Sequence, residues 1–210
     1  MIKNSKLFFI VFLSIFILNP GSGLARDEVP HAELPVLITS CGQSPGATML
    51  KVIFSRLDLE KEPEPYDINP LAAKEDLQAA EKSGRPFKSL IIVMGASLKG
   101  MGAAGISMDE ELKRIDDLIK SARKKDITII GAHIEGMKRR AQGASPGDNT
   151  DELSIDAVAP QSDILLVNES GNEDLRFTTI SNNHNIPMLA VEKNLDLIPA
   201  MKNLFNLDPS

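Results

Sequence analysis

The feature that most constrains the fold is a regular alternation between short, mainly apolar runs and longer segments with helical periodicity. The apolar runs occupy residues 35–39, 89–94, 127–131, 163–167 and 187–191. Because they are continuous rather than interrupted by polar residues at every second position, they are typical of strands covered on both faces. Helices are predicted between and after them, over residues 47–57, 71–82, 109–125, 174–183 and 195–204.

This alternation with short connections predicts an α/β fold. We expect a single doubly wound, mostly parallel sheet of the flavodoxin-like or Rossmann-like kind, in three α/β/α layers. Tyr66–Ile68 is a weaker strand candidate, because the prolines that flank it suit an edge strand. Counting it as the second strand, we expect the order 2-1-3-4-5. Residues 109–125 form the clearest helix, with Ser107 and Glu110 spaced as a capping box at its start.

The first 25 residues have the layout of a secretory signal peptide. Lys3 and Lys6 precede the apolar run 7–18, and the small residues Gly23 and Ala25 occupy the positions before a cleavage site. The alternative is a retained membrane anchor, but a bilayer-spanning helix needs about 20 apolar residues and this run is shorter. We therefore expect an exported protein, periplasmic or secreted, without a stable membrane span.

After this signal, residues 26–34 are expected to form a flexible leader and residues 35–210 a single α/β domain. The formal charge of the chain is −6, which argues against a nucleic-acid partner, because such proteins need a basic face. One cysteine allows neither an internal disulfide nor a thiolate metal site.

Polar residues gather directly after several of the predicted strands. In open α/β sheets, ligands bind beyond the carboxyl ends of the strands, so these loops are expected to line one rim. The predicted ligand-binding residues are Ser40, Gly42, Gln43, Ser44, Ser97, Lys99, Gly100, Gly102, Arg139, Arg140, Asn168 and Glu169.

The loop after the first strand is the strongest candidate for binding an anion. Ser44 and Pro45 precede a predicted helix, which leaves backbone N–H groups directed at the rim. The alternative is an ordinary strand–helix turn in which Ser44 caps the helix. Gly100, Gly102 and Gly105 spell G-x-G-x-x-G, but they do not follow the first strand, so a loop closing over a ligand is favoured over a dinucleotide site.

Cys41, His133 and Glu135 are the candidate catalytic residues. A helix start beside Cys41 would activate its thiol, and His133 on the same rim would serve as its base. The alternative is a small buried thiol. His133 and Glu135 are too few ligands for a metal site, and none is predicted. Arg139 and Arg140 form either an anion clamp or a solvated basic face.

Four motifs carry a resemblance to a known family: PVLITSCGQSPGA, SLIIVMGASLKGMGAAGI, ITIIGAHIEGMKRR and SDILLVNESGN. With them, residues 35–205 resemble an uncharacterised bacterial family of exported α/β proteins, known only as a domain of unknown function. The resemblance implies one Rossmann-like or flavodoxin-like domain behind a signal peptide. It brings no activity, cofactor or catalytic residue.

Three functions are compatible with these observations. The leading hypothesis is an exported protein that binds a small polar or anionic ligand at the carboxyl edge of the sheet. The second is a hydrolase or transferase that uses Cys41 with His133. The third is a non-catalytic protein partner within a cell-envelope complex. The sequence identifies no cofactor.

Overall fold

The computed structural model describes residues 31–59, 62–141 and 149–207. The predicted signal peptide and most of the predicted leader lie outside these residues. The strands are β1 (Val36–Cys41), β2 (Tyr66–Ile68), β3 (Ser89–Met94), β4 (Thr128–His133), β5 (Ile164–Asn168) and β6 (Met188–Val191). The α-helices are α1 (Gly46–Phe54), α2 (Lys74–Lys82), α3 (Leu98–Ala104), α4 (Met108–Arg123), α5 (Thr150–Val158), α6 (Arg176–His184) and α7 (Leu197–Leu204). Short 3₁₀ turns are η1 (Gly136–Arg139), η2 (Ala159–Gln161), η3 (Glu169–Asn172) and η4 (Asn194–Asp196).

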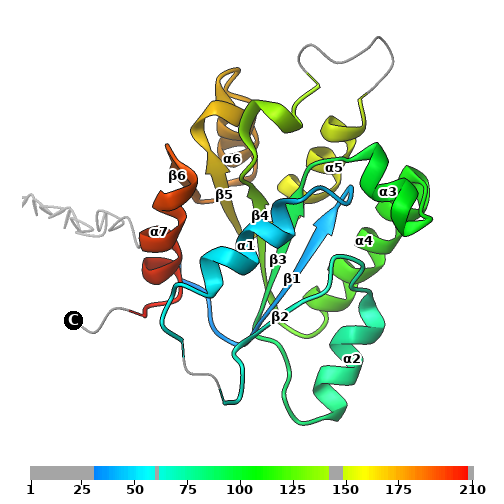
Figure 1. Cartoon of the computed structure of the whole chain (residues 1–210), viewed down its shortest axis with the longest axis vertical. Helices are drawn as coiled ribbons and strands as arrows, with labels where there is room; N and C mark the ends of the chain where they lie inside the picture. Colours follow the sequence, from blue (N-terminus) through cyan, green and yellow to red (C-terminus); the bar gives the residue numbers. More distant parts are fainter. Residues whose placement is uncertain (1–30, 60–61, 142–148, 208–210) are drawn as a thin grey trace, which may run out of the picture.

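The strands form one parallel sheet in the order β2-β1-β3-β4-β5-β6 (Figure 1). This confirms the predicted α/β fold class and the order of the first five strands, with β6 added beyond β5. The weak candidate β2 is an edge strand, as expected. The chain moves from β1 outward to β2 and then returns to β3 on the other side of β1. The topological switch point therefore lies between β1 and β3.

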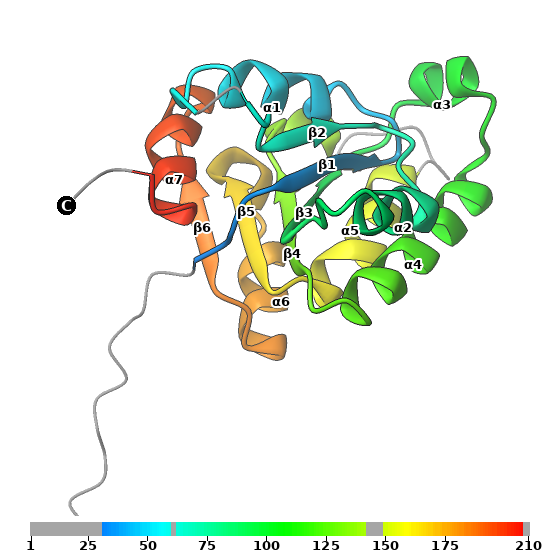
Figure 2. The same cartoon turned by 90° about the horizontal axis from the view of Figure 1, so that it is seen from below.

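Helices cover the sheet on both faces, which makes three layers (Figure 2). On one face α1 and α7 pack with residues such as Ile38 and Ile91, and on the other α2, α4, α5 and α6 pack with residues such as Leu37 and Ile92. Neighbouring strand residues thus alternate between two apolar layers. This double burial explains why the strands read as continuous apolar runs.

The capping box predicted for the helix that became α4 is present. The Ser107 hydroxyl accepts a hydrogen bond from the Glu110 amide at 3.3 Å, and the Glu110 carboxylate accepts one from the Ser107 amide at 2.9 Å. The helices α3 and α5 were not predicted. In α3, the glycines at 100 and 102 favour a loop by propensity, but Ser97 caps the helix by accepting from the Gly100 amide.

Candidate functional site

The loops after β1 and β3 lie against each other at the switch point. The Ser97 amide donates to the Gly42 carbonyl at 2.7 Å, and Gln43 and Ala96 form an isolated antiparallel bridge. Gly42 has a φ of 103°, and a Cβ there would collide with the backbone of the β3 loop. The predicted rim residues of these loops are therefore brought together. Their backbones meet directly, which leaves little room for a ligand between them.

A buried ion pair beneath these loops was missed by sequence reasoning. The Glu111 side chain is fully buried and accepts hydrogen bonds from the Gly42 amide at 2.8 Å and from Gln43 Nε2 at 2.9 Å. Arg114 Nη2 pairs with Glu111 at 2.9 Å and donates to the Ser40 carbonyl at 2.6 Å. Ser40 and Gln43 are thus engaged inside the protein. The missed signal was the spacing of Glu111, four residues before the buried Ile115 on the core-facing stripe of α4.

Cys41 and His133 do not form a catalytic pair, which corrects that prediction. The strand registers place β3 between them, because Cys41 lies opposite Met94 of β3, and His133 follows Ala132 of β4, which lies opposite Val93. Two strand spacings separate them by about 10 Å, well beyond hydrogen-bond reach. Cys41 lies in an aliphatic cluster with Leu37 and Leu90. Burial, with a further contribution from the charge of Glu111, raises the pKa of its thiol far above its usual range. The buried-thiol alternative describes Cys41.

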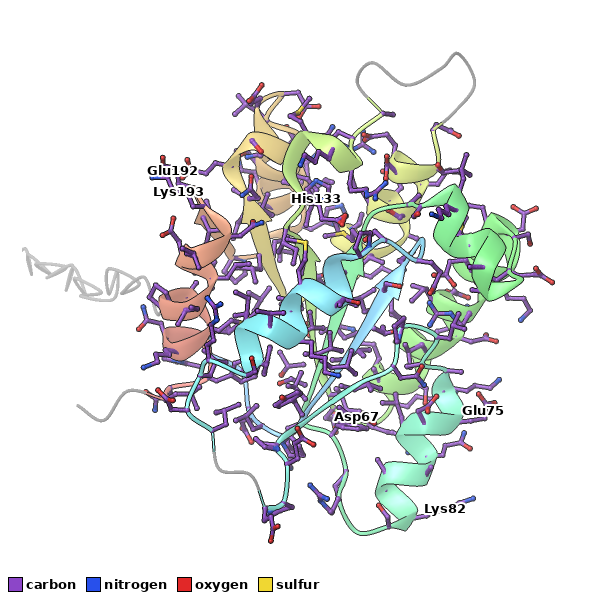
Figure 3. The ribbon with its side chains drawn as sticks, in the orientation of Figure 1. Asp67, Glu75, Lys82, His133, Glu192 and Lys193 are labelled. Carbon is purple, nitrogen blue, oxygen red and sulfur yellow. The ribbon has the colours of Figure 1, made fainter. Side chains whose placement is uncertain are left out.

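His133 is a buried core residue rather than a general base. Its ring nitrogens lie 3.2 Å from the carbonyl oxygens of Met94 and Gly136, and its ring packs against Phe177 with centroids 4.9 Å apart. Burial lowers its pKa to about 4, so the ring is neutral at pH 7. Figure 3 shows His133 inside the molecule, while Glu192 and Lys193 lie at its periphery.

Arg140 is not an anion clamp, because carboxylates of the protein already surround it. Its guanidinium pairs with Glu152 at 2.8 Å and with Asp174 at 2.6 Å, and it lies 5.7 Å from the centroid of the Phe177 ring. Its side chain is only 2% exposed. The hydrogen bonds to Asp174 and Glu152 raise its pKa further above its usual range. Arg140, the residue directly after η1, therefore links this segment to α5 and to the loop before α6.

Arg139 occupies a more open position over the loop after β3. Its Nε donates to the Glu135 carboxylate at 2.8 Å and its Nη1 to the Ala96 carbonyl at 2.8 Å. The side chain remains 25% exposed. Glu135 thus binds Arg139 rather than acting with His133, and the predicted catalytic role of Glu135 has no support.

The start of α1 lies beside Arg139. A Cβ placed on Gly95 would lie 3.1 Å from Arg139 Cγ and 3.3 Å from Ser44 Oγ, so both side chains pack close to Gly95. The Ser44 hydroxyl accepts only a long hydrogen bond of 3.4 Å, from the Gly46 amide. Ala47 is 1% exposed, and its amide has no acceptor among the residues that the structure describes. A buried N–H without a partner is rare in folded proteins.

The other predicted rim residues are dispersed. Lys99 and Glu169 are exposed, and a Cβ on Gly102 would meet open space. The Asn168 amide oxygen accepts from the Ser170 amide at 3.1 Å and so caps η3. None of these residues lies in the contacts that join Ser44 and Arg139.

Within residues 31–59, 62–141 and 149–207, no three His, Cys, Asp or Glu side chains gather closely enough to hold a metal ion. The helices in these same ranges are all too short or too polar to cross a bilayer.

The fold and the rim define an α/β protein with one parallel sheet, in which ion pairs inside the protein hold the strand-end loops. Residues 33–205 match the family described as "Domain of unknown function (DUF6305)", and the chain belongs to this family. A search of curated proteins finds no match.

Among solved structures, the chain is similar to three esterases or lipases. A psychrotrophic esterase from Pseudoalteromonas sp. has a TM-score of 0.34 and 11% identity, over 75% of this chain and 77% of that one. An acetyl xylan esterase has a TM-score of 0.37 and 9% identity, over 80% and 82%. A GDSL-like lipase from Bacteroides thetaiotaomicron has a TM-score of 0.32 and 12% identity, over 76% and 71%. Similarity at these TM-scores does not bear on the activity of the chain.

Proposed function

We propose that this protein binds a small anionic ligand at the carboxyl edge of its sheet, at the start of α1. The observation that carries the proposal is the buried Ala47 amide, which has no acceptor in the described structure and lies at a helix start. Such N–H groups, reinforced by the helix dipole, are suited to an anion. This is the leading hypothesis from the sequence, narrowed to one end of the rim.

Two side chains would complete the site. The Ser44 hydroxyl borders the helix start, and a carboxylate or phosphate oxygen is a better acceptor for its proton than any contact it makes in the structure. Arg139 would supply a cation, because its hydrogen bonds to Glu135 and to the Ala96 carbonyl fix the position of its guanidinium group. Among the described residues, no histidine or carboxylate side chain forms a hydrogen bond with the Ser44 hydroxyl, so the proposal is binding rather than hydrolysis.

Titration with inorganic phosphate tests the proposal, with amide chemical shifts read by NMR and sodium chloride as the ionic-strength control. The Ala47 and Gly46 resonances should move to saturation. Replacing Arg139 with Gln should weaken binding about ten- to hundredfold, because a charge-assisted hydrogen bond is lost. Ser44→Ala should weaken it about fivefold.

Lys138→Gln is the matched control, because Lys138 is the exposed neighbour of Arg139 and carries the same charge. Equal loss of affinity in Arg139→Gln and Lys138→Gln would mean that only the general positive field attracts phosphate. If phosphate binding saturates without a shift of the Ala47 amide resonance, the ligand binds elsewhere. Either result contradicts the proposal.

Export is a second part of the proposal, supported by the charged start, the apolar run 7–18 and the small residues at Gly23 and Ala25. N-terminal sequencing of the protein from its producing cells should begin at Arg26. An intact Met1 in a membrane fraction would instead indicate an anchor.

A further inference from the structure

An apolar groove runs between α1 and the segment formed by η4 and α7. One wall consists of Met49, Val52 and Ile53 on one face of α1, and of Arg56, which lies two residues beyond the end of the helix. The opposite wall includes Leu195, and the groove encloses about 310 Å³. Figures 1 and 2 show α1 and α7 side by side on the same face of the sheet.

The apolar side chains that line the groove differ in their exposure to solvent. Val52 is 49% exposed and Leu195 is 63% exposed, and they stand on opposite walls. Leu197 and Ile53, which also line the groove, are buried. The groove therefore has buried apolar residues in its lining and one exposed apolar side chain on each wall. A single exposed leucine needs no explanation, but exposed apolar side chains on both walls of an apolar groove are typical of an interaction site.

The charge at the groove indicates what fits there. Arg56 is the one ionisable residue in the lining, and it forms no ion pair with any residue that the structure describes. The chain as a whole has a net charge of −6, so this unpaired cation stands on a predominantly acidic protein. An apolar occupant that also carries a carboxylate would match both features.

The length of the α1 wall suits a short helix as the occupant of the groove. The nine residues of α1 extend over about 13 Å, which corresponds to between two and three helical turns. Recognition of an amphipathic helix in a groove uses apolar anchors at i, i+3, i+4 and i+7. We propose that the groove between α1 and α7 binds an amphipathic helix of a partner protein, with an acidic residue of that helix against Arg56. The anion site at the other end of α1 plays no part in this.

The test uses fluorescence anisotropy with a labelled synthetic helix built from alanine and glutamine. The peptide carries leucine at i, i+3, i+4 and i+7 and a glutamate on the same face at each end. It should bind the mature protein, whereas a peptide of the same composition with scrambled leucine positions should not. Leu195→Ser should weaken binding about tenfold or more, because one apolar anchor is lost. Leu98→Ser is the matched control, because Leu98 is 64% exposed and distant from the groove, and it should leave binding unchanged.

A charge swap makes the test independent of the leucines. Arg56→Glu should weaken binding of the glutamate peptide and strengthen binding of the same peptide with lysine in place of glutamate. Equal binding of the scrambled peptide, or equal effects of Leu195→Ser and Leu98→Ser, would overturn the proposal. A dimer in analytical ultracentrifugation that dissociates in Leu195→Ser would overturn it too, because a second copy would then be the occupant. Phosphate titration of Leu195→Ser should match wild type, so failure here is distinct from failure of the anion site.

Discussion

The fully buried Glu111 offers the most direct test of how the rim is built. Glu111→Ala removes the acceptor of the Gly42 amide and of Gln43 Nε2, and it leaves the Arg114 guanidinium, which is 11% exposed, without its counter-charge. Removing one partner of a buried ion pair costs about 3–5 kcal/mol of unfolding free energy. For a domain of this size, that corresponds to a drop in Tm of about 6–20 °C.

Urea unfolding followed by far-UV circular dichroism measures this, since the chain has no Trp. Glu111→Gln keeps an acceptor for the Gly42 amide and should lose only about 1.5–3 kcal/mol, the value of a hydrogen bond to a charged group. Asp116→Ala is the control on the same helix, because its carboxylate pairs with Lys120 at the surface and should matter far less. A loss below about 1 kcal/mol for Glu111→Ala would refute the reasoning. So would equal losses for Ala at positions 111 and 116.

Three further predictions concern residues that the sequence singled out. Cys41 should react with Ellman's reagent only after unfolding in guanidinium chloride, because burial raises the pKa of its thiol; rapid reaction of the native protein would contradict this. The pKa of His133 falls from its ordinary 6.5 to about 4 on folding. The unfolded chain therefore takes up the proton first as the pH falls, and about 3 kcal/mol of stability should be lost between pH 6.5 and pH 4. This loss should vanish in His133→Asn and persist in His184→Asn, as measured by urea midpoints at each pH. Gly100→Ala should destabilise by about 1–3 kcal/mol because its Cβ would collide with the Gln43 carbonyl, whereas Gly102→Ala, with open space around it, should stabilise by about 0.5–1 kcal/mol; urea midpoints that shift in the same direction would contradict it.

The fold was predictable because its signals are local and redundant. Each central strand is buried on both faces, so it appears in the sequence as an apolar run whatever its partners are. The start of α4 was readable from Ser107 and Glu110 for the same reason, since a capping box is complete within four residues. The start and end of the first strand were less clear: it extends through Ser40 and Cys41, whose polar character suggested a loop.

The site was predictable only to the level of loops. The predicted topology correctly placed the segments after β1 and β3 at one edge of the sheet. Which side chains remain available there depends on partners far away in the sequence, such as Asp174 for Arg140 and Glu111 for Gly42. Arg139 and Arg140 are therefore equivalent in the sequence, although carboxylates enclose Arg140 and Arg139 is partly exposed. Cys41 and His133 were paired in the prediction because both end strands, but the intervening β3 separates them.

The start of α1 differs from the starts of α2 and α4, and this difference leads to a last prediction. The Ala73 amide at the start of α2 is bound by the Asp76 carboxylate at 2.8 Å, and α4 has its Ser107–Glu110 box. In contrast, α1 has no acidic residue in its first turn and no side-chain cap. An external anion would supply the missing negative charge, and so would a carboxylate introduced at Thr48, the third residue of α1 and exposed.

Thr48→Glu should therefore stabilise the ligand-free protein by about 0.3–1 kcal/mol, since a negative charge near a helix start is favourable. It should also abolish phosphate binding, because the new carboxylate competes for the same N–H groups and repels the anion. Ser55→Glu, which adds the same charge at the other end of the helix, should do neither. Urea midpoints and phosphate titrations of both variants measure the two effects. If Thr48→Glu still binds phosphate like wild type, the anion does not sit at the start of α1, whatever stability the substitution adds.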